Sequence, residues 1–231
     1  YMEPVGPESG TTPITVEYVK GVERLCRKYG ALLVFDEVVT GFRIGMAGAQ
    51  GYFGVSPDLT IFGKVIAGGY PGAGGIGGKR EYMKYLGAGL DSSGKKIHKA
   101  LVGGTMTANP LSCCAGYFTL EEIERTNACQ KAGQMGDRIC AGLKELVKKH
   151  GLPFVVWNTG SICHLETVGT MHYQINWKKP WEIPAILGET GIRQKEMEHM
   201  GAAYMAEGLV TLAGSRLYTS AAYTPKMIDQ A

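Results

Sequence analysis

Residues 31–43 constrain the fold of this chain more than any other stretch. They read ALLVFDEVVTGFR, so five apolar residues run directly into two carboxylates, Asp36 and Glu37. A short continuous apolar run bounded by turn residues predicts a strand buried on both faces, as in a parallel sheet. In open α/β sheets the ligand crevice lies beyond the carboxyl ends of the strands. Because an unpaired buried carboxylate is costly, we expect Asp36 to face a cation at that end.

The neighbouring segments predict a βαβ unit. Residues 2–4 resemble the end of a strand, and from Pro13 apolar residues recur at helical spacing until Gly30, which suits a helix C-cap. Residues 57–62 predict another short strand, which ends at Gly63-Lys64. Strand, helix and strand joined by short links indicate the α/β class.

The rest of the chain predicts a second, smaller unit. We expect helices over residues 80–86, 110–125, 128–150 and 193–207, with Asn109 and Pro110 at the start of the second. Strands are expected over residues 154–157, 161–165, 208–212 and 215–219. With a boundary near Thr126, residues 1–126 form a large α/β domain and residues 127–231 a small α+β domain.

Composition argues against several classes of function. The net charge is only +3 and no dense run of Lys and Arg occurs, so we expect no nucleic-acid partner. No apolar stretch reaches transmembrane length, so we expect no membrane partner. The six cysteines and the histidines lack metal-ligand spacing, so we expect no metal site. Reduced thiols in a chain without a leader favour a cytoplasmic location.

A lysine completes a set of residues with a shared chemistry. Lys64 follows a predicted strand and precedes the glycine-rich residues 65–78, whose backbone can approach a ligand closely. A lysine amine in a desolvated pocket can form a Schiff base with a carbonyl cofactor. Pyridoxal phosphate (PLP) requires this lysine, a carboxylate on its ring nitrogen, apolar packing on its ring and donors for its phosphate. Asp36, Val38 and Thr105, in a Gly-Gly-Thr turn with Gly104, fit the other three roles.

Four segments together resemble the class III aminotransferases of fold type I. They are EPV at 3–5, LVFDEVVTGFR at 33–43, PDLT through GKVIAGGYP at 57–71, and GGTMTANP at 103–110. The segment AGAQGYFGVSPD at 47–58 is especially similar to glutamate-1-semialdehyde 2,1-aminomutases. The resemblance is densest over residues 1–126. It implies a mixed, mostly parallel sheet with helices, followed by the small domain.

The resemblance also implies roles for individual residues. Lys64 would carry the cofactor as a Schiff base, Asp36 would pair with the pyridine nitrogen, and Val38 would pack on the ring. Thr105, with Gly104, would bind the phosphate across the interface of a homodimer. Glu3 and Gln50 are further members of the expected cofactor site.

The resemblance leaves the reaction open. We expect amino-group transfer on small-molecule donors and acceptors. The alternatives are an intramolecular amino shift, as in the aminomutases, a racemase or epimerase, or an inactive fragment. The family's upstream half, with its phosphate-binding segment, does not match this chain, which resembles the C-terminal part. Thr107-Ala108-Asn109 also replaces the Ser-Gly-Asn that is usual in the aminomutases.

Overall fold

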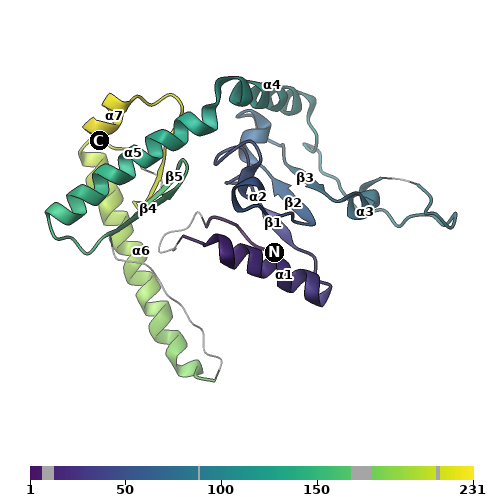
Figure 1. The fold of residues 1–231 in the computed structure, drawn as a ribbon, viewed down its shortest axis with the longest axis horizontal. Helices are drawn as coiled ribbons and strands as arrows, with labels where there is room; N and C mark the ends of the chain where they lie inside the picture. Colours follow the sequence, from purple (N-terminus) through teal and green to yellow (C-terminus); the bar gives the residue numbers. More distant parts are fainter. Residues whose placement is uncertain (7–12, 88, 168–177, 212–213) are drawn as a thin grey trace. The chain divides into compact units, whose positions relative to one another are not determined.

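The structure, a computed structural model, divides into two compact units (Figure 1). It describes residues 1–6, 13–87, 89–167, 178–211 and 214–231. The first unit comprises residues 1–5 and 14–128, and the second comprises residues 6–13 and 129–231. Within the described residues, no helix is both long and apolar enough to cross a membrane.

The first unit is built on a three-stranded mixed sheet. Strand β1 (Val34–Asp36) pairs in parallel with β2 (Leu59–Phe62), which pairs antiparallel with β3 (Gly75–Gly78). Met2 forms a parallel bridge to Phe35 on the other side of β1. Helix α1 (Val16–Tyr29) connects Met2 to β1, so the predicted βαβ unit is confirmed.

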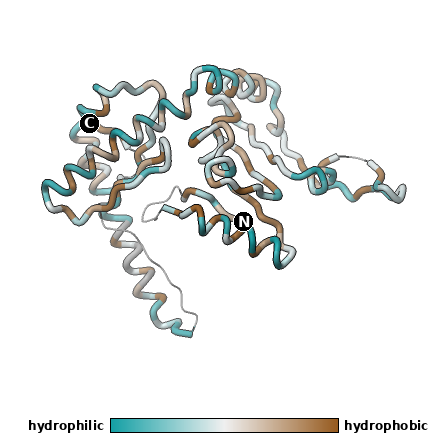
Figure 2. Tube along the Cα trace, viewed as in Figure 1, coloured by the Kyte–Doolittle hydropathy of each residue, from teal (hydrophilic) through white to brown (hydrophobic). Residues whose placement is uncertain are grey.

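Helix α1 ends at Gly30, as the sequence predicts, and begins at Val16, three residues after the predicted start at Pro13. The Thr15 side chain accepts a hydrogen bond from the Tyr18 N–H, and Gly30 ends the helix in the left-handed conformation. Apolar and polar residues alternate along α1 in Figure 2. Val19 is its buried contact with the core, so an amphipathic face anchors the helix.

The strand at residues 34–36 is shorter and less enclosed than its sequence predicts. Leu33 and Phe35 are fully buried, but Leu32 is 46% exposed and Val34 is only half-buried. The prediction of a strand buried on both faces is therefore wrong in this chain. Side chains alternate across a strand, and in the described structure only the face with Leu33 and Phe35 is covered.

Glycine-rich residues form the third strand of this sheet, and short helices surround it. No strand is predicted within the glycine-rich residues 65–78, yet Gly75–Gly78 form β3, because pairing with β2 uses backbone groups alone. The sheet region also contains two short helices, α2 (Gly48–Phe53) and α3 (Arg80–Met83). Two 3₁₀ turns, η1 (Lys64–Ala67) and η2 (Lys84–Leu86), complete it. Helix α4 (Pro110–Thr126) starts at Asn109, whose side chain accepts hydrogen bonds from Leu111 and Ser112, as predicted.

The second unit packs helices on a three-stranded antiparallel sheet. Its strands are β4 (Val155–Thr159), β5 (Ile162–Glu166) and β6 (Arg216–Tyr218), in that order. Helix α5 (Ala128–Lys149) contributes Cys140, Ile139, Leu143 and Val147 to a core with Val156, Cys163, Leu165 and Leu217. Helix α7 (Pro225–Gln230) is tied to α5 by an ion pair between Arg138 and Asp229 at 2.6 Å.

Two predictions in this unit are wrong. Helix α6 (Ile183–Ala206) begins ten residues before the predicted start at 193, directly after a 3₁₀ turn η3 (Pro180–Glu182). Pro184 lies in the first helical turn, where its missing N–H costs nothing. The described part of residues 208–212 is not a strand, because the N–H groups of Gly208 and Leu209 donate to Met205 and Tyr204 at the end of α6.

Candidate active site

Asp36 and Lys64 lie at the same edge of the first sheet. Asp36 is the last residue of β1 and aligns with Ile61 of the parallel strand β2. Lys64 comes three residues after Ile61, just beyond the end of β2. Carboxyl ends of parallel strands meet at one edge of a sheet, which is where α/β folds bind ligands. The structure therefore places these two residues at one edge of the sheet.

Lys64 has an unusual backbone conformation. Its φ angle is +52°, in the left-handed region that residues with a Cβ rarely adopt. Such strain costs on the order of 1–3 kcal/mol and clusters at functional sites. Its side chain is exposed in this chain, so the desolvated pocket that the sequence analysis expects is not formed by the described residues.

Val38 packs beside this lysine turn. A Cβ placed on Gly63, the residue before Lys64, would lie 3.2 and 3.3 Å from the two Cγ atoms of Val38. A side chain at position 63 would therefore press on Val38, and only glycine lets the two segments approach this closely. The structure brings Val38 and the Lys64 turn together, as the expected ring-packing role requires.

Asp36 is engaged by two donors. The Val38 N–H donates to its Oδ1 at 3.0 Å, and the Tyr1 hydroxyl donates to its Oδ2. The hydrogen bond to Asp36 is the main reason that the pKa of Tyr1 lies above its ordinary value. Tyr1 is 74% exposed, so one of the two donors to Asp36 is a phenol at the surface. No sequence pattern singled out Tyr1.

Glu37 forms a buried network that the sequence analysis did not identify. Its carboxylate is 1% exposed and accepts hydrogen bonds from Thr40 Oγ1 (3.0 Å), the Ala49 N–H (2.6 Å) and the Gln50 N–H and Nε2 (3.2 Å each). A Cβ on Gly48 would lie 2.1 Å from Glu37 Oε2. Glu37 therefore fixes the segment after Asp36 to the start of α2. Alternation along the strand, which points Glu37 away from Asp36, was the available signal.

The remaining expected cofactor residues lie apart from this edge or are held by other groups. Gln50 is committed to Glu37 and to Thr60 Oγ1, at 3.4 Å. Glu3 is exposed, one residue after the Met2 bridge to Phe35. Gly104 and Thr105 are exposed, and Thr105 begins the turn that precedes α4.

The turn around Thr105 is nevertheless connected to the segment that follows Lys64. A Cβ on Gly72 would lie 2.9 Å from Met106 Cβ, and Ser112 Oγ donates to the Pro71 carbonyl at 2.6 Å. At Gly116 in α4, a Cβ would lie 1.9 Å from the carbonyl oxygen of Ile66 in η1. These close contacts hold α4 and its N-terminal turn against the 3₁₀ turn that carries Lys64.

A pocket of about 340 Å³ lies next to the Glu37 network. None of Asp36, Val38 or Lys64 lines it, so it is not the lysine site. Its lining residues are Gly41, Phe42, Met46, Ala47, Gly48, Gln50, Gly51, Val55, Ser56 and Phe62.

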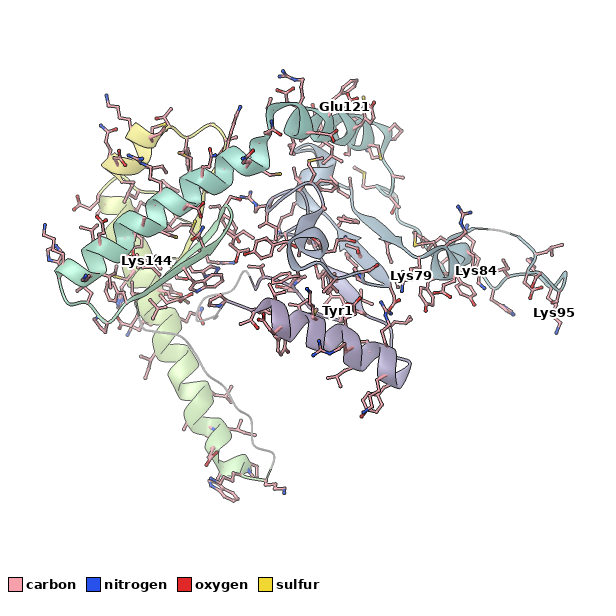
Figure 3. All side chains as sticks on the ribbon, viewed as in Figure 1. Tyr1, Lys79, Lys84, Lys95, Glu121 and Lys144 are labelled. Atoms are coloured by element: carbon pink, nitrogen blue, oxygen red, sulfur yellow. The ribbon has the colours of Figure 1, made fainter. Side chains whose placement is uncertain are left out.

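A buried carboxylate with two partly exposed cations braces the same sheet from its other end. Asp58, before β2, has a fully buried side chain that pairs with Arg27 and Lys79, each at 2.7 Å, and accepts from the Leu33 N–H at 2.8 Å. Figure 3 labels Lys79 after β3. Burial alone would raise the pKa of Asp58, but the hydrogen bonds from Leu33, Lys79 and Arg27 lower it to about 2. Asp58 is therefore a structural anion.

Among the described residues, no group of three or more His, Cys, Asp and Glu side chains is arranged to hold a metal ion.

The family follows from comparison with known proteins. The family model for aminotransferase class-III matches residues 1–213. The chain belongs to the class III aminotransferases.

Curated relatives of this class III aminotransferase chain are aminomutases. It is 34% identical to glutamate-1-semialdehyde 2,1-aminomutase 2 of Brevibacillus brevis, over 99% of this chain and 49% of that protein. It is 41% identical to glutamate-1-semialdehyde 2,1-aminomutase 1 of Staphylococcus epidermidis, over 70% of this chain and 35% of that protein. The chain spans about half the length, or less, of the curated relatives it matches.

Solved structures agree on the fold. An omega-transaminase from Sphaerobacter thermophilus matches 99% of this class III chain and 48% of its own, with a TM-score of 0.76 and 24% identity. A transaminase with PLP bound matches the same shares at a TM-score of 0.76 and 23% identity. Likeness at this identity shows the fold. The predicted α/β fold, the C-terminal part of a fold type I transferase, is confirmed.

Proposed function

We propose that this chain is part of a PLP-dependent enzyme that moves an amino group, with Lys64 as the residue that binds the cofactor covalently. The observation that carries the proposal is the position of Lys64. It is a strained, left-handed lysine at the end of β2, and Asp36 ends the neighbouring parallel strand. Family membership supports the same chemistry.

The residues at this sheet edge fit the cofactor. Lys64 is an accessible primary amine, and Asp36 offers a carboxylate whose second partner, Tyr1, is exposed and displaceable. Val38 packs against Gly63, the residue before Lys64, and its N–H donates to Asp36. An amine, a carboxylate and an apolar side chain at one edge meet three of the four requirements of PLP, and donors for its phosphate are the fourth.

Each residue then has a definite task. When bound, the cofactor supplies an electron sink that stabilises negative charge on the substrate carbon. Asp36 would hold the ring nitrogen protonated, and Val38 would pack on the ring face. Lys64, once released as an amine, would accept and return the proton at the substrate carbon. Thr105 and Gly104 would contribute hydroxyl and N–H donors to the phosphate. Glu3 and Gln50 would hold in place the residues that contact the cofactor.

Absorbance spectroscopy tests the role of Lys64. The full-length protein with PLP should show the visible band of the lysine-bound cofactor, and Lys64→Ala should abolish it. Lys84→Ala, an exposed lysine on η2, is the matched control and should keep the band. An unchanged band in Lys64→Ala would refute the proposal.

An intramolecular amino shift is the second candidate, because the curated relatives carry the aminomutase name. Turnover assays with an amino donor and a keto acid separate the reactions. Keto-acid-dependent turnover identifies a transferase, isomerisation of an amino-aldehyde acid identifies an aminomutase, and loss of optical activity identifies a racemase. The absence of all three with bound cofactor indicates an inactive fragment.

We also propose that the protein forms a homodimer in the cytoplasm. Large apolar side chains gather, exposed, on α4 and the segment before it: Leu101, Val102, Met106, Leu111, Tyr117 and Phe118. Exposed apolar groups of this size favour a protein partner, and Thr105 lies among them. The six free cysteines fit a reducing compartment. Sedimentation should give twice the monomer mass, and Phe118→Asp should shift it toward monomer; a monomeric parent protein would contradict the dimer.

A further inference from the structure

The second unit contains a buried pair of cysteines that the proposed function does not use. Cys140 of α5 is 1% exposed and Cys163 of β5 is 0% exposed. Both belong to the apolar core between helix and sheet. Interaction with the Cys163 side chain is the first cause of the lowered pKa of the Cys140 thiol, so the two groups influence each other across the helix–sheet interface.

The backbone brings the two sulfur atoms together. Cys163 Sγ donates to the carbonyl of Gly136, one helical turn before Cys140, at 3.7 Å. Cys140 Sγ donates to the carbonyl of Trp157 on the strand next to Cys163, at 3.6 Å. A Cβ on Gly136 would lie 2.3 Å from the Gly160 carbonyl and 3.1 Å from Cys163 Sγ. Because position 136 lacks a side chain, α5 approaches the β4–β5 hairpin closely enough for Cys163 Sγ to lie against the helical turn that leads to Cys140.

The surroundings of Cys140 favour its thiolate form. The hydrogen bond from Cys163 and, to a smaller extent, the charge of Lys144 lower the pKa of its thiol, while burial and Asp137 oppose them. Lys144 projects from the same helix (Figure 3). The thiolate is the reacting form of a cysteine, and a neighbouring cation and donor favour it.

The exposed cysteines are less suited to a bridge. Cys113 and Cys114 are neighbours on α4 and both are exposed. A disulfide between adjacent helical residues distorts the backbone, whereas residues on two packed elements can meet the required geometry. Accessible thiols such as these would instead each take up a small thiol reagent.

We propose that Cys140 and Cys163 are a reversible disulfide site, oxidised by low-molecular-weight disulfides. The Cys140 thiolate attacks one sulfur of the reagent, forming a mixed disulfide and releasing one reagent thiolate. Cys163 loses its proton to solvent and attacks the Cys140 sulfur, which forms the internal bond and releases the second thiolate. The two cysteines lose two electrons and the reagent disulfide gains them.

The bond would tie α5 to β5 across the core of the second unit. Both sulfurs are buried, so the reagent must enter through local opening of this unit. The site is independent of PLP chemistry, and it stands even if Lys64 does not bind the cofactor.

Peptide mapping of the full-length protein tests this site. The protein is incubated with oxidised glutathione under native conditions, remaining thiols are blocked with N-ethylmaleimide, and the product is digested with trypsin. Cys140 and Cys163 lie alone in their expected tryptic peptides, residues 139–144 and 150–178. A disulfide-linked pair of these peptides should form, carry no glutathione and disappear after dithiothreitol.

Variants separate the pair from other thiols. The double variant Cys113→Ser/Cys114→Ser should keep the linked peptides, whereas Cys140→Ala and Cys163→Ala should each lose them. The wild-type map alone decides the matter if a core variant fails to fold. Glutathione on Cys140 without the internal bond, or both cysteines blocked by maleimide while Cys113 and Cys114 carry glutathione, would overturn the proposal.

Discussion

At the scale of single residues, the site is defined by side chains that follow two adjacent strands. Lys64 adopts a left-handed conformation just beyond the end of β2, and Asp36 accepts a hydrogen bond from the Val38 N–H. Glu37, the next residue, points away and is held by four donors. Alternation along β1 thus separates a carboxylate available to a ligand from one that fixes the backbone.

Asp36→Asn tests the available carboxylate. The amide keeps the size and the hydrogen bond from Val38 but cannot keep a ring nitrogen protonated. We expect the variant to bind PLP and to lose activity by roughly 10²-fold or more, the scale of a lost charge interaction in a transition state. Spectroscopic titration with PLP and steady-state kinetics measure the two effects. Activity within a few-fold of wild type would contradict the role.

At the scale of elements, the Lys64 turn depends on a close helix contact. Gly116→Ala would place a methyl group 1.9 Å from the Ile66 carbonyl, so η1 or α4 must shift. We expect a loss of roughly 1–3 kcal/mol in the free energy of unfolding, measured by urea denaturation. Gly21→Ala on α1 is the control: its Cβ meets nothing closer than 3.7 Å, so a gain of about 0.5–1 kcal/mol is expected. Equal effects of both substitutions would refute the contact.

Elements with local end signals were predictable, and those that depend on distant backbone pairing were not. Gly30, and Asn109 with Pro110, carry their capping chemistry in the sequence, so α1 ends and α4 begins as predicted. Strand β3 consists of glycines and one isoleucine, and only β2 makes it a strand. The early start of α6 was hidden by Pro184, which resembles a loop residue until the helix around it is known.

At the scale of the whole molecule, one buried anion links three parts of the first unit. Asp58 joins Arg27 of α1, Lys79 after β3 and the Leu33 N–H before β1. Its pKa is lowered to about 2 from an ordinary 3.8. A lowered acid pKa stabilises the fold above the unfolded pKa, and that stability is lost as pH falls toward the folded pKa.

The first unit should therefore lose about 2 kcal/mol of stability through Asp58 between roughly pH 4.5 and pH 2. Denaturation at a series of pH values measures this loss. Asp58→Asn should be less stable at neutral pH and should lack this part of the acid dependence. An identical pH profile in the variant would show that Asp58 is not the responsible group.

The positions of candidate site residues were predictable only where the pairing of strands determines them. Asp36 and Lys64 follow two apolar runs, and parallel pairing of those runs places them at one edge. The contact of Tyr1 with Asp36 spans 35 residues of sequence, and Gln50 is held by Glu37 rather than free for a ligand. Such side-chain pairings depend on the folded backbone, and no local pattern encodes them.

Borohydride reduction of the PLP-loaded, full-length protein tests the central claim most directly. Reduction fixes any covalently held cofactor to its lysine, and tryptic mapping then identifies that lysine. The account predicts a phosphopyridoxyl group on Lys64, within a peptide of residues 44–79, because the modified lysine resists cleavage. A label on any other lysine, or bound cofactor with no label at all, would contradict it.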